Sequence, residues 1–396
     1  MISVAQAQEI INAQTLVLPN ISVPLMESLG KTLAEDILAD RDFPPFNRVT
    51  MDGIAIDFQS IQNNFWPIQN RQLAGQDQLN LEAQNQAIEV MTGAMLPLGT
   101  DTVIRYEDID IEEVNGKMIA TLTVNFEVIK QGQNIHKQGS DAKKGDCLIA
   151  KNTKISSPQI AVMASVGKDN VLINASPKIA IIATGNELVE IEEKPLPHQI
   201  RKSNSYMLEA ILKQHGLGAS LFHLQDDIEE LESKLGQLLQ NFDVLILSGG
   251  VSEGKADFIP QVLENLNVKK HFHKIAQRPG KPFWFGTGPT QQNVFALPGN
   301  PVSTYVCFLK YVLPTLIAPK IPQFAVLIQE ISFKPTLTYF VPVWLSVSEN
   351  GQLQANPQLG NGSGDFANLL KANALIELPA NKSSFEIGEV YPVISF

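Results

Sequence analysis

Apolar runs alternate with amphipathic stretches between residues 173 and 318. Three short runs are apolar almost throughout, KIAIIA at 178–183, VLIL at 244–247 and VFAL at 294–297. Between them, leucine and isoleucine recur every three or four residues, as over 228–238. Apolar runs of this kind are typical of strands buried on both faces, and the longer spacing is typical of helices that cover a sheet. The pattern predicts an α/β domain with a doubly wound parallel sheet and right-handed crossovers.

The regions on either side of this domain favour strands. Residues 103–130 hold two β-branched runs around Asn115-Gly116, and Asn-Gly in that position is typical of a β-hairpin. Residues 41–139 are therefore expected to form a β-rich module. Residues 320–396 lose the helical spacing, which predicts a small β-barrel or sandwich.

One helix is predicted between the β-rich module and the α/β domain. Ser157 is expected as its N-cap, with Pro158 at the first helical position. Gly167 is expected to end it.

Charge excludes one class of partners. The chain has 30 Lys and Arg against 41 Asp and Glu, a formal net charge of -11. Nucleic acids and anionic membranes need a cationic surface, so neither is an expected partner. The most apolar stretch, 305–317, is short and interrupted by Lys310, so no membrane span is predicted.

Cysteine usage and the N-terminal segment indicate the compartment. Only Cys147 and Cys307 are present, which excludes a disulfide framework and any multi-cysteine metal site and suits a reducing compartment. The first residues have polar Gln and Asn where a signal peptide needs an apolar core. We therefore expect a cytoplasmic protein.

A loop of small residues follows each of the three apolar runs. The loops begin Thr184-Gly185-Asn186, Ser248-Gly249-Gly250 and Pro298-Gly299-Asn300. Ligands of open α/β sheets bind beyond the carboxyl ends of the strands, where glycine allows close approach and helix N-termini favour anions. Together the loops predict one crevice for an anionic ligand, although each loop alone is also compatible with an ordinary strand-to-helix turn.

Cationic residues are expected near the same crevice. Arg278 and Lys281 flank a Pro-Gly pair, and Lys274 precedes them by four residues. Fixed cations in an acidic protein suggest a bound oxyanion or phosphate. A solvated basic turn is the alternative.

Carboxylates at this edge suggest a magnesium site. Glu187, Asp226, Asp227 and Asp257 are expected at or near the same sheet edge, and Mg²⁺ prefers oxygen ligands beside substrate phosphate. Asp226 and Asp227 could equally be first-turn residues of a helix, which the helix dipole favours.

Other catalytic motifs are weak or absent. His271 and His273 would share one face of a strand, but without a third ligand a half-buried pair of strand histidines is the preferred interpretation. The chain has no GxxxxGK[ST] and no GxSxG motif, and Ser252 has no obvious histidine partner, so a P-loop and serine hydrolysis are not expected.

The ordered set of motifs resembles the molybdopterin molybdenumtransferase family, which includes MoeA and the E domain of gephyrin. The matching segments run nearly from end to end: 45–55 (PFNRVTMDGIA), 91–99 (MTGAMLPLG), 132–141 (GQNIHKQGSD), 184–188 (TGNEL), 203–205 (SNS), 248–252 (SGGVS), 279–282 (PGKP) and 297–303 (LPGNPVS). Each segment alone is weakly specific, and their order is highly specific.

The resemblance implies a multidomain fold of α/β and β parts in an elongated homodimer. It implies a discontinuous N-terminal and linker domain (1–40 with 140–172), a β-rich insert (41–139), an α/β domain of the molybdopterin-binding type (173–319) and a C-terminal β-barrel (320–396). The active cleft of the family lies between the α/β domain of one subunit and the insert of the other.

The resemblance also implies the reaction. Molybdate enters adenylylated molybdopterin, the adenylyl bond is hydrolysed with the help of Mg²⁺, and AMP leaves. The molybdopterin adenylyltransferase and recipient molybdoenzymes are the implied protein partners.

Site residues are carried over by position. Implied catalytic residues are Asp52, Asp141, Glu187, Asp226, Asp257, Lys274, Arg278 and Lys281, with Glu187, Asp226 and Asp257 as metal ligands. Implied substrate-binding residues are Thr92, Thr184, Gly185, Asn186, Ser248, Gly249, Gly250, Ser252, Pro298, Pro301, Ser303 and Ser363.

Several positions depart from the family pattern. Val49 replaces a serine, Ile54 a tyrosine, and His136 the usual basic residue. Pro342 lies where the family often has arginine, and Arg278 replaces a lysine, which changes the geometry of the charge. These departures keep an alternative open, a catalytically weakened paralog that carries molybdopterin or acts as a dimeric scaffold.

Overall fold

The computed structural model describes residues 1–251, 258–317 and 321–396. Internal contacts divide the chain into two compact units, residues 20–174 and residues 1–19 with 175–396. No helix within the described residues is long and apolar enough to cross a membrane.

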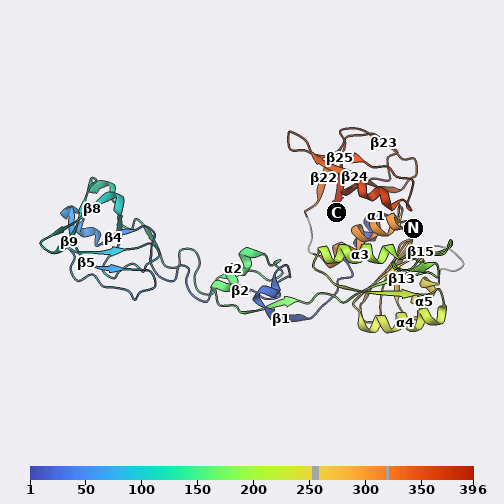
Figure 1. Cartoon of the computed structure of the whole chain (residues 1–396), viewed down its shortest axis with the longest axis horizontal. Helices are drawn as coiled ribbons and strands as arrows, with labels where there is room; N and C mark the ends of the chain where they lie inside the picture. Colours follow the sequence, from blue (N-terminus) through green and yellow to red (C-terminus); the bar gives the residue numbers. More distant parts are fainter. Residues whose placement is uncertain (252–257, 318–320) are drawn as a thin grey trace. The chain divides into compact units, whose positions relative to one another are not determined.

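The unit of residues 20–174 contains a six-stranded sheet in the order β7-β4-β6-β5-β9-β8. Figure 1 labels β4, β5, β8 and β9 of this sheet. Its strands are β4 (Gly53–Ile56), β5 (Phe65–Gln72), β6 (Ala87–Val90), β7 (Thr102–Arg105), β8 (Ile109–Val114) and β9 (Lys117–Leu122). β8 and β9 pair directly through a two-residue turn in which Asn115 and Gly116 both have positive φ. This turn is the predicted hairpin, because left-handed backbone at both central residues favours Asn-Gly.

Segments before and after this sheet share a second core. β1 (Asn20–Pro24) pairs with β12 (Asn170–Asn174), and β2 (Ile37–Leu38) pairs with β11 (Cys147–Ile149). Helix α2 (Ser157–Ser165) packs Met163 against them.

The predicted α2 helix exists, but its predicted N-cap is wrong by one residue. Ser156 has the extended cap conformation, and its backbone N–H donates to the Gln159 side chain over 3.1 Å. Ser157 is therefore the first helical residue. Gly167, with φ +75°, follows the helix as expected.

The other unit is built on a six-stranded sheet in the order β16-β13-β17-β21-β20-β18. Its strands are β13 (Ile179–Thr184), β16 (Ala219–Leu224), β17 (Val244–Ser248), β18 (Lys269–His273), β20 (Trp284–Thr287) and β21 (Asn293–Leu297). The three apolar runs form β13, β17 and β21, which are parallel as predicted, and β16 joins them in parallel.

The sheet is parallel as predicted over β16, β13, β17 and β21, and it differs at one edge. β20 runs antiparallel to both β21 and β18. Only residues 288–292 connect β20 to β21, which is too short for a helical crossover and allows only a hairpin.

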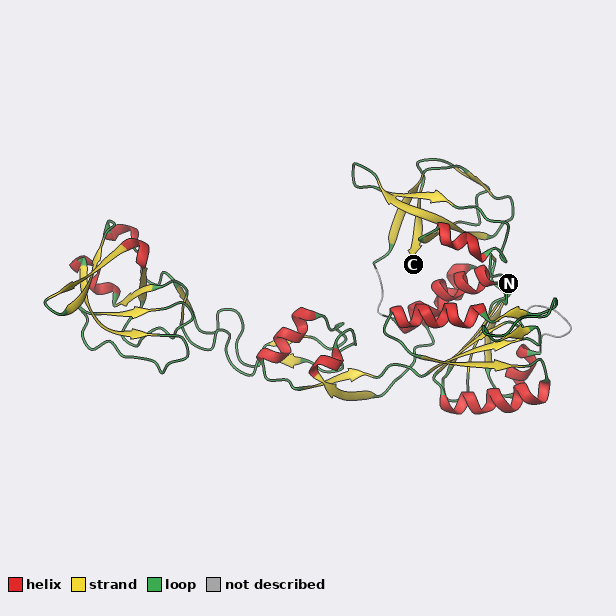
Figure 2. Ribbon diagram, viewed as in Figure 1, coloured by secondary structure: helices red, strands yellow, loops and turns green. Residues whose placement is uncertain are grey.

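Helices cover both faces of this sheet, as expected (Figure 2). Helix α3 (Ser203–Gln214) and α6 (Pro301–Cys307) pack on one face, and α4 (Ile228–Asn241) and α5 (Ile259–Asn265) on the other. Helix α1 (Val4–Asn12) joins the first face.

Helix α1 presents three apolar side chains to that core, Val4, Ala7 and Ile11. Their three- and four-residue spacing makes one apolar stripe. Contacts therefore group residues 1–19 with the α/β sheet, whereas the family resemblance groups them with residues 20–40.

The C-terminal strands close into a barrel rather than a sandwich. The order is β24-β25-β22-β28-β26, and β26 also pairs with β24. The strands are β22 (Gln323–Leu327), β24 (Thr338–Val347), β25 (Leu353–Pro357), β26 (Ala374–Leu378) and β28 (Val390–Ser395). The short strand β19 (Gln277–Arg278) lies between β18 and β20 in the sequence, but it pairs with the start of β24 in the barrel.

Candidate functional site

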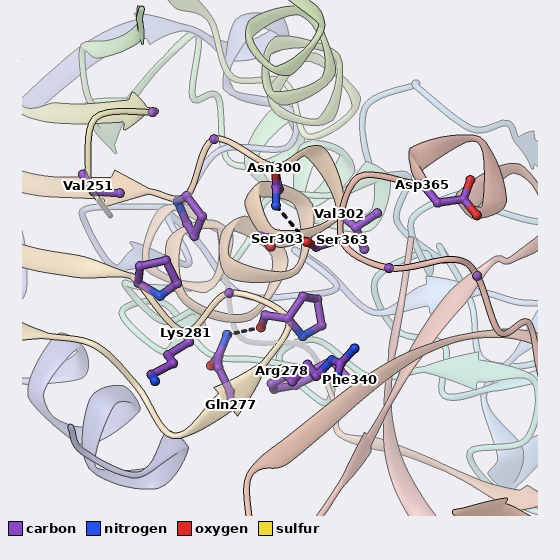
Figure 3. Close-up of a pocket in the computed structure, with 18 of the residues that line it drawn as sticks. Val251, Gln277, Arg278, Lys281, Asn300, Val302, Ser303, Phe340, Ser363 and Asp365 are labelled. Atoms are coloured by element: carbon purple, nitrogen blue, oxygen red, sulfur yellow. Dashed lines mark hydrogen bonds between the residues drawn. The ribbon is translucent and has the colours of Figure 1, made fainter. Parts of the chain in front are cut away.

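A cavity of about 880 Å³ lies beyond the carboxyl ends of β13, β17 and β21 (Figure 3). The register aligns Ala183 with Ser248 and Ser248 with Leu297, so the three following loops start side by side. Eleven predicted site residues line the cavity: Thr184, Gly185, Glu187, Asp226, Gly249, Gly250, Arg278, Lys281, Pro298, Ser303 and Ser363. The structure therefore brings together the loops that the sequence predicts to converge.

Glycine is required where the loops cross. Gly249 has φ +104°, and a Cβ there would lie 2.7 Å from the carbonyl oxygen of Thr184. A Cβ on Gly299 would lie 3.6 Å from the Cα of Gly249, so two loops meet backbone to backbone. The Thr184 hydroxyl is buried beside them, without a hydrogen-bond partner among the described residues. The absence of side chains at this crossing leaves the backbone open to close approach by a ligand.

Two of the predicted metal ligands line the cavity. The Glu187 carboxylate folds back over Gly185, where a Cβ would lie 2.5 Å from Oε2. The backbone N–H of Asp226 donates to Asn186 Oδ1 over 3.0 Å, which ties the two carboxylate-bearing loops together. Asp227 instead caps α4 by accepting a hydrogen bond from the Glu230 N–H over 2.9 Å. Each of the two interpretations therefore fits one residue of the pair: Asp226 lines the cavity, and Asp227 caps the helix.

The charges of the lining suit a divalent cation beside an anionic ligand. The described lining has the carboxylates Glu187, Asp226 and Asp365 against the cations Arg278 and Lys281. Carboxylate oxygens with room for water or phosphate fit the preference of Mg²⁺. The described residues contain no group of three His, Cys, Asp or Glu side chains that could hold a metal by themselves. Two further predicted residues, Ser252 and Asp257, lie outside the described residues.

A buried glutamine holds the loop of residues 278–281, which carries Arg278 and Lys281. Gln277 is fully buried, its Nε2 donates to the Pro279 carbonyl over 2.9 Å, and its Oε1 accepts from the Tyr311 hydroxyl. Gly280 has φ +90°, and a Cβ there would lie 2.5 Å from Cys307 Sγ. Arg278 and Lys281 are exposed to solvent in the cavity wall.

The barrel module closes the cavity through the loop around Ser363. The Asn300 amide donates to Ser363 Oγ over 2.8 Å, and the Val302 N–H donates to the Ser363 carbonyl over 3.1 Å. The backbone N–H of Asn361 donates to the Asp365 carboxylate over 3.0 Å and holds the same loop. Ser363 was a predicted site residue, and these hydrogen bonds fix it at the N-terminus of α6.

Several lining residues were not predicted as site residues. They are Gln277, Asn300, Tyr339, Phe340, Asp365 and Asn368. Asn300 lies inside a recognised motif, so its place in that motif could have identified it. The barrel residues belong to strands and loops that reach the cavity only through the tertiary fold.

Four predicted residues in the described part of the α/β domain do not line the cavity. Ser248 Oγ accepts a hydrogen bond from the Asn204 amide over 2.9 Å and faces the core. Pro301 starts α6, and Asn186 bonds to the backbone of the Asp226 loop. The backbone N–H of Lys274 donates to the Phe283 carbonyl over 2.9 Å. Asn186, Ser248 and Pro301 shape the loops, because their contacts are with other parts of the protein.

His271 and His273 follow the preferred interpretation of a half-buried strand pair. His271 Nε2 contacts Thr287 Oγ1 over 3.0 Å, and His273 Nε2 contacts the Val251 carbonyl over 3.1 Å. Burial lowers the pKa of His271, with a smaller effect from Lys269.

Three predicted residues belong to the unit of residues 20–174. Asp52 Oδ1 accepts hydrogen bonds from the Thr92 backbone N–H over 2.6 Å and from its hydroxyl over 2.8 Å. These hydrogen bonds lower the pKa of Asp52, because they favour its ionised form. Asp141 Oδ1 lies 2.7 Å from His136 Nε2, and Arg48 lies 3.0 Å from the other ring nitrogen.

Comparisons with known proteins cover the whole chain. Family models match in order: the MoeA N-terminal region (domains I and II) at residues 2–167, a probable molybdopterin binding domain at 180–318 and the MoeA C-terminal region (domain IV) at 325–396. The chain belongs to the MoeA family. The molybdopterin molybdenumtransferase of Synechocystis sp. is 39% identical, over 99% of each chain.

Other relatives agree with this assignment to the MoeA family. The molybdopterin molybdenumtransferase of Bacillus subtilis is 32% identical over 94% of this chain and 89% of its own. A crystal structure of the molybdopterin biosynthesis MoeA protein from Pyrococcus horikoshii has a TM-score of 0.84 and 30% identity, and it covers 100% of this chain and 99% of its own. Membership in the family assigns the chain to molybdenum cofactor biosynthesis, as a transferase.

The departures from the MoeA pattern fall into two kinds. Val49 and Ile54 are fully buried in separate cores, so they are packing positions. His136 is part of the contact chain between Arg48 and Asp141, and Pro342 lines the cavity. Arg278, which replaces a lysine, also lines the cavity, so a ligand could meet it as well as this second pair.

Proposed function

We propose that this chain transfers molybdenum from molybdate into adenylylated molybdopterin, with Mg²⁺-dependent hydrolysis of the adenylyl bond and release of AMP. The observation that carries the proposal is the single cavity in which three glycine-containing loops meet two cations and two predicted metal ligands. A pterin nucleotide with a pyrophosphate link and a dianionic oxyanion needs this combination of amide donors, cations and a metal-binding site.

Roles follow from the chemistry of the side chains. Arg278 and Lys281 would bind molybdate and phosphate oxygens, and the backbone around Gly249 would approach the pterin nucleotide. Glu187 and Asp226, with Asp257 as the proposed third ligand, would hold Mg²⁺, which supplies charge neutralisation at the phosphate when bound.

The remaining predicted residues would shape the cavity and orient the substrate. Thr184, Gly185, Gly250, Ser252, Pro298, Ser303 and Ser363 are proposed substrate contacts. Lys274, Asn186, Ser248 and Pro301 are proposed to support the loops that carry those contacts. The proposed domains of the chain are residues 1–40 with 140–172, 41–139, 173–319 and 320–396.

Asp52, Thr92 and Asp141 are proposed to serve the same reaction from the insert side of the cleft. The family resemblance motivates this role, together with the hydrogen bonds that keep Asp52 ionised. A cytoplasmic homodimer, with a molybdopterin adenylyltransferase and recipient molybdoenzymes as protein partners, completes the proposal.

A carrier or scaffold is the alternative, and Pro342 favours it. This residue lines the cavity where the family often has arginine, so oxyanion capture loses one cation. His136 replaces a second basic residue. A carrier would bind molybdopterin tightly without molybdate-dependent chemistry.

The test is AMP release by the purified full chain from adenylylated molybdopterin, molybdate and Mg²⁺. The proposed function predicts AMP release that requires molybdate, and lower release by Lys281→Met. Exposed Lys269, at the start of β18 and outside the cavity lining, offers a matched control in Lys269→Met. Pterin binding without AMP above background would favour the carrier and refute the transferase mechanism.

A further inference from the structure

The cations of the cavity come from one short segment. Within the described lining, Arg278 and Lys281 are the cationic side chains, and both flank the Pro-Gly turn after β19. The barrel contributes Pro342 to the same wall. Oxyanion capture therefore depends on how firmly these two flexible side chains are held.

Arg278 lies over the Phe333 ring of the barrel, and that ring stacks on Tyr339. β19 pairs with β24 so that Arg278 and Tyr339 are direct neighbours. The guanidinium carbon of Arg278 lies 5.8 Å from the centre of the Phe333 ring. Phe333 and Tyr339 stack on each other, with ring centres 4.1 Å apart and planes 17° apart.

The aromatic pair is itself well fixed. Phe333 is only 7% exposed, and its backbone N–H donates to the Ser383 carbonyl over 2.8 Å. Burial raises the pKa of Tyr339, although Arg278 partly opposes the shift, so its phenol stays neutral and does not compete with an anionic ligand. The rings thus offer Arg278 a rigid apolar face.

We infer that Phe333 and Tyr339 are positioning residues that hold Arg278 in the orientation needed for oxyanion capture. The inference rests on the proposed function and deepens it, because it assigns the oxyanion step to a cation supported by the barrel. A guanidinium is planar and weakly hydrated, so it stacks on an aromatic face better than an ammonium group does. Holding the side chain before binding reduces the entropy lost when the oxyanion binds.

This inference also gives a physical meaning to one departure from the family. Arg278 stands where the family has lysine, in the chain that lacks the basic residue at Pro342. A lysine could not use the aromatic pair in the same way. Arg278 and the pair together replace part of the missing cation.

The test is a double-mutant cycle on the full chain, with inorganic molybdate as the probe and calorimetric titration as the measurement. Phe333→Leu keeps an apolar side chain but removes the ring, and we expect about threefold to tenfold weaker binding. In an Arg278→Lys background the same change should weaken binding less than about twofold. Phe333→Tyr keeps an aromatic ring and should bind molybdate with the affinity of the wild type.

A second cycle separates positioning from general structure. Lys281 has no contact with the aromatic pair among the ring contacts of the described residues, so Phe333→Leu should keep its full effect in a Lys281→Met background. An equal loss in the Arg278→Lys and Lys281→Met backgrounds would overturn the inference. Failure of the wild type to bind molybdate up to millimolar concentration would overturn it as well.

Steady-state kinetics distinguish this inference from the proposed function. Phe333→Leu should raise the KM for molybdate and leave kcat at saturating molybdate near the wild-type value. Molybdate binding with the expected coupling, but no AMP release by the wild type, would refute the transferase and leave the positioning role intact. A fall in kcat with unchanged KM would contradict the positioning role.

Discussion

Replacement of Gly249 by alanine tests the loop crossing at the centre of the cavity. The new Cβ would lie 2.7 Å from the Thr184 carbonyl oxygen and 3.0 Å from its hydroxyl oxygen. It would also force an L residue to adopt φ +104°. Backbone strain of this kind costs about 1–3 kcal/mol, and overpacking adds about 1–3 kcal/mol.

Gly216 supplies the matched control. It has φ +70°, and nothing lies within 4 Å of its would-be Cβ, so alanine there adds backbone strain without overlap. We expect Gly249→Ala to be less stable than Gly216→Ala by about 1–3 kcal/mol, or about 2–10 °C in melting temperature. Differential scanning calorimetry measures this difference.

Ligand binding should separate the two variants further. Gly249→Ala should lose affinity for molybdopterin, because its methyl group would occupy the crossing of the loops, whereas Gly216→Ala should bind like the wild type. Equal melting temperatures and equal pterin affinities for the two variants would refute the loop crossing as described.

Three further changes test separate contacts. Asp226→Asn should lower the rate of AMP release by at least about tenfold, because it removes a proposed metal ligand. Asp227→Asn keeps a good helix cap and should leave turnover and folding unchanged. Equal steady-state rates for the two variants would contradict the different roles of Asp226 and Asp227. Thr92→Val removes one of the hydrogen bonds that lower the pKa of Asp52 in the folded protein. The stabilisation from these hydrogen bonds is present at neutral pH and is lost as the pH falls through the folded pKa, so Asp52 of the variant should titrate at higher pH by NMR. An unchanged titration of Asp52 would contradict the assignment. Burial raises the pKa of the Cys307 thiol, so mass spectrometry should find it unmodified by iodoacetamide at about pH 8 in the native protein. Rapid alkylation would show that reagents reach the thiol and would contradict its burial.

Local chemistry made some elements predictable from the sequence. The Asn115-Gly116 hairpin follows from positive φ at both turn residues, which few other pairs tolerate. The parallel strands β13, β17 and β21 follow from apolar runs that only a doubly covered sheet can bury. Their loops converge because the carboxyl ends of parallel strands share one edge.

Features set by tertiary pairing were beyond the sequence. Among the described strands of the α/β sheet, β20 alone runs against the others, and its direction depends on the short connection to β21. Tyr339 and Asp365 reach the cavity only because the barrel packs beside the α/β sheet. Ser248 lies in a recognised motif yet faces the core, since Asn204 donates a hydrogen bond to it there.

A crystal structure of the protein with adenylylated molybdopterin would test the central claim most directly. The account predicts ligand density in the one cavity, with the pterin nucleotide against Gly249, anionic groups near Lys281 and the ligand within reach of Ser363. A fully occupied ligand on another surface, with this cavity holding only solvent, would contradict it.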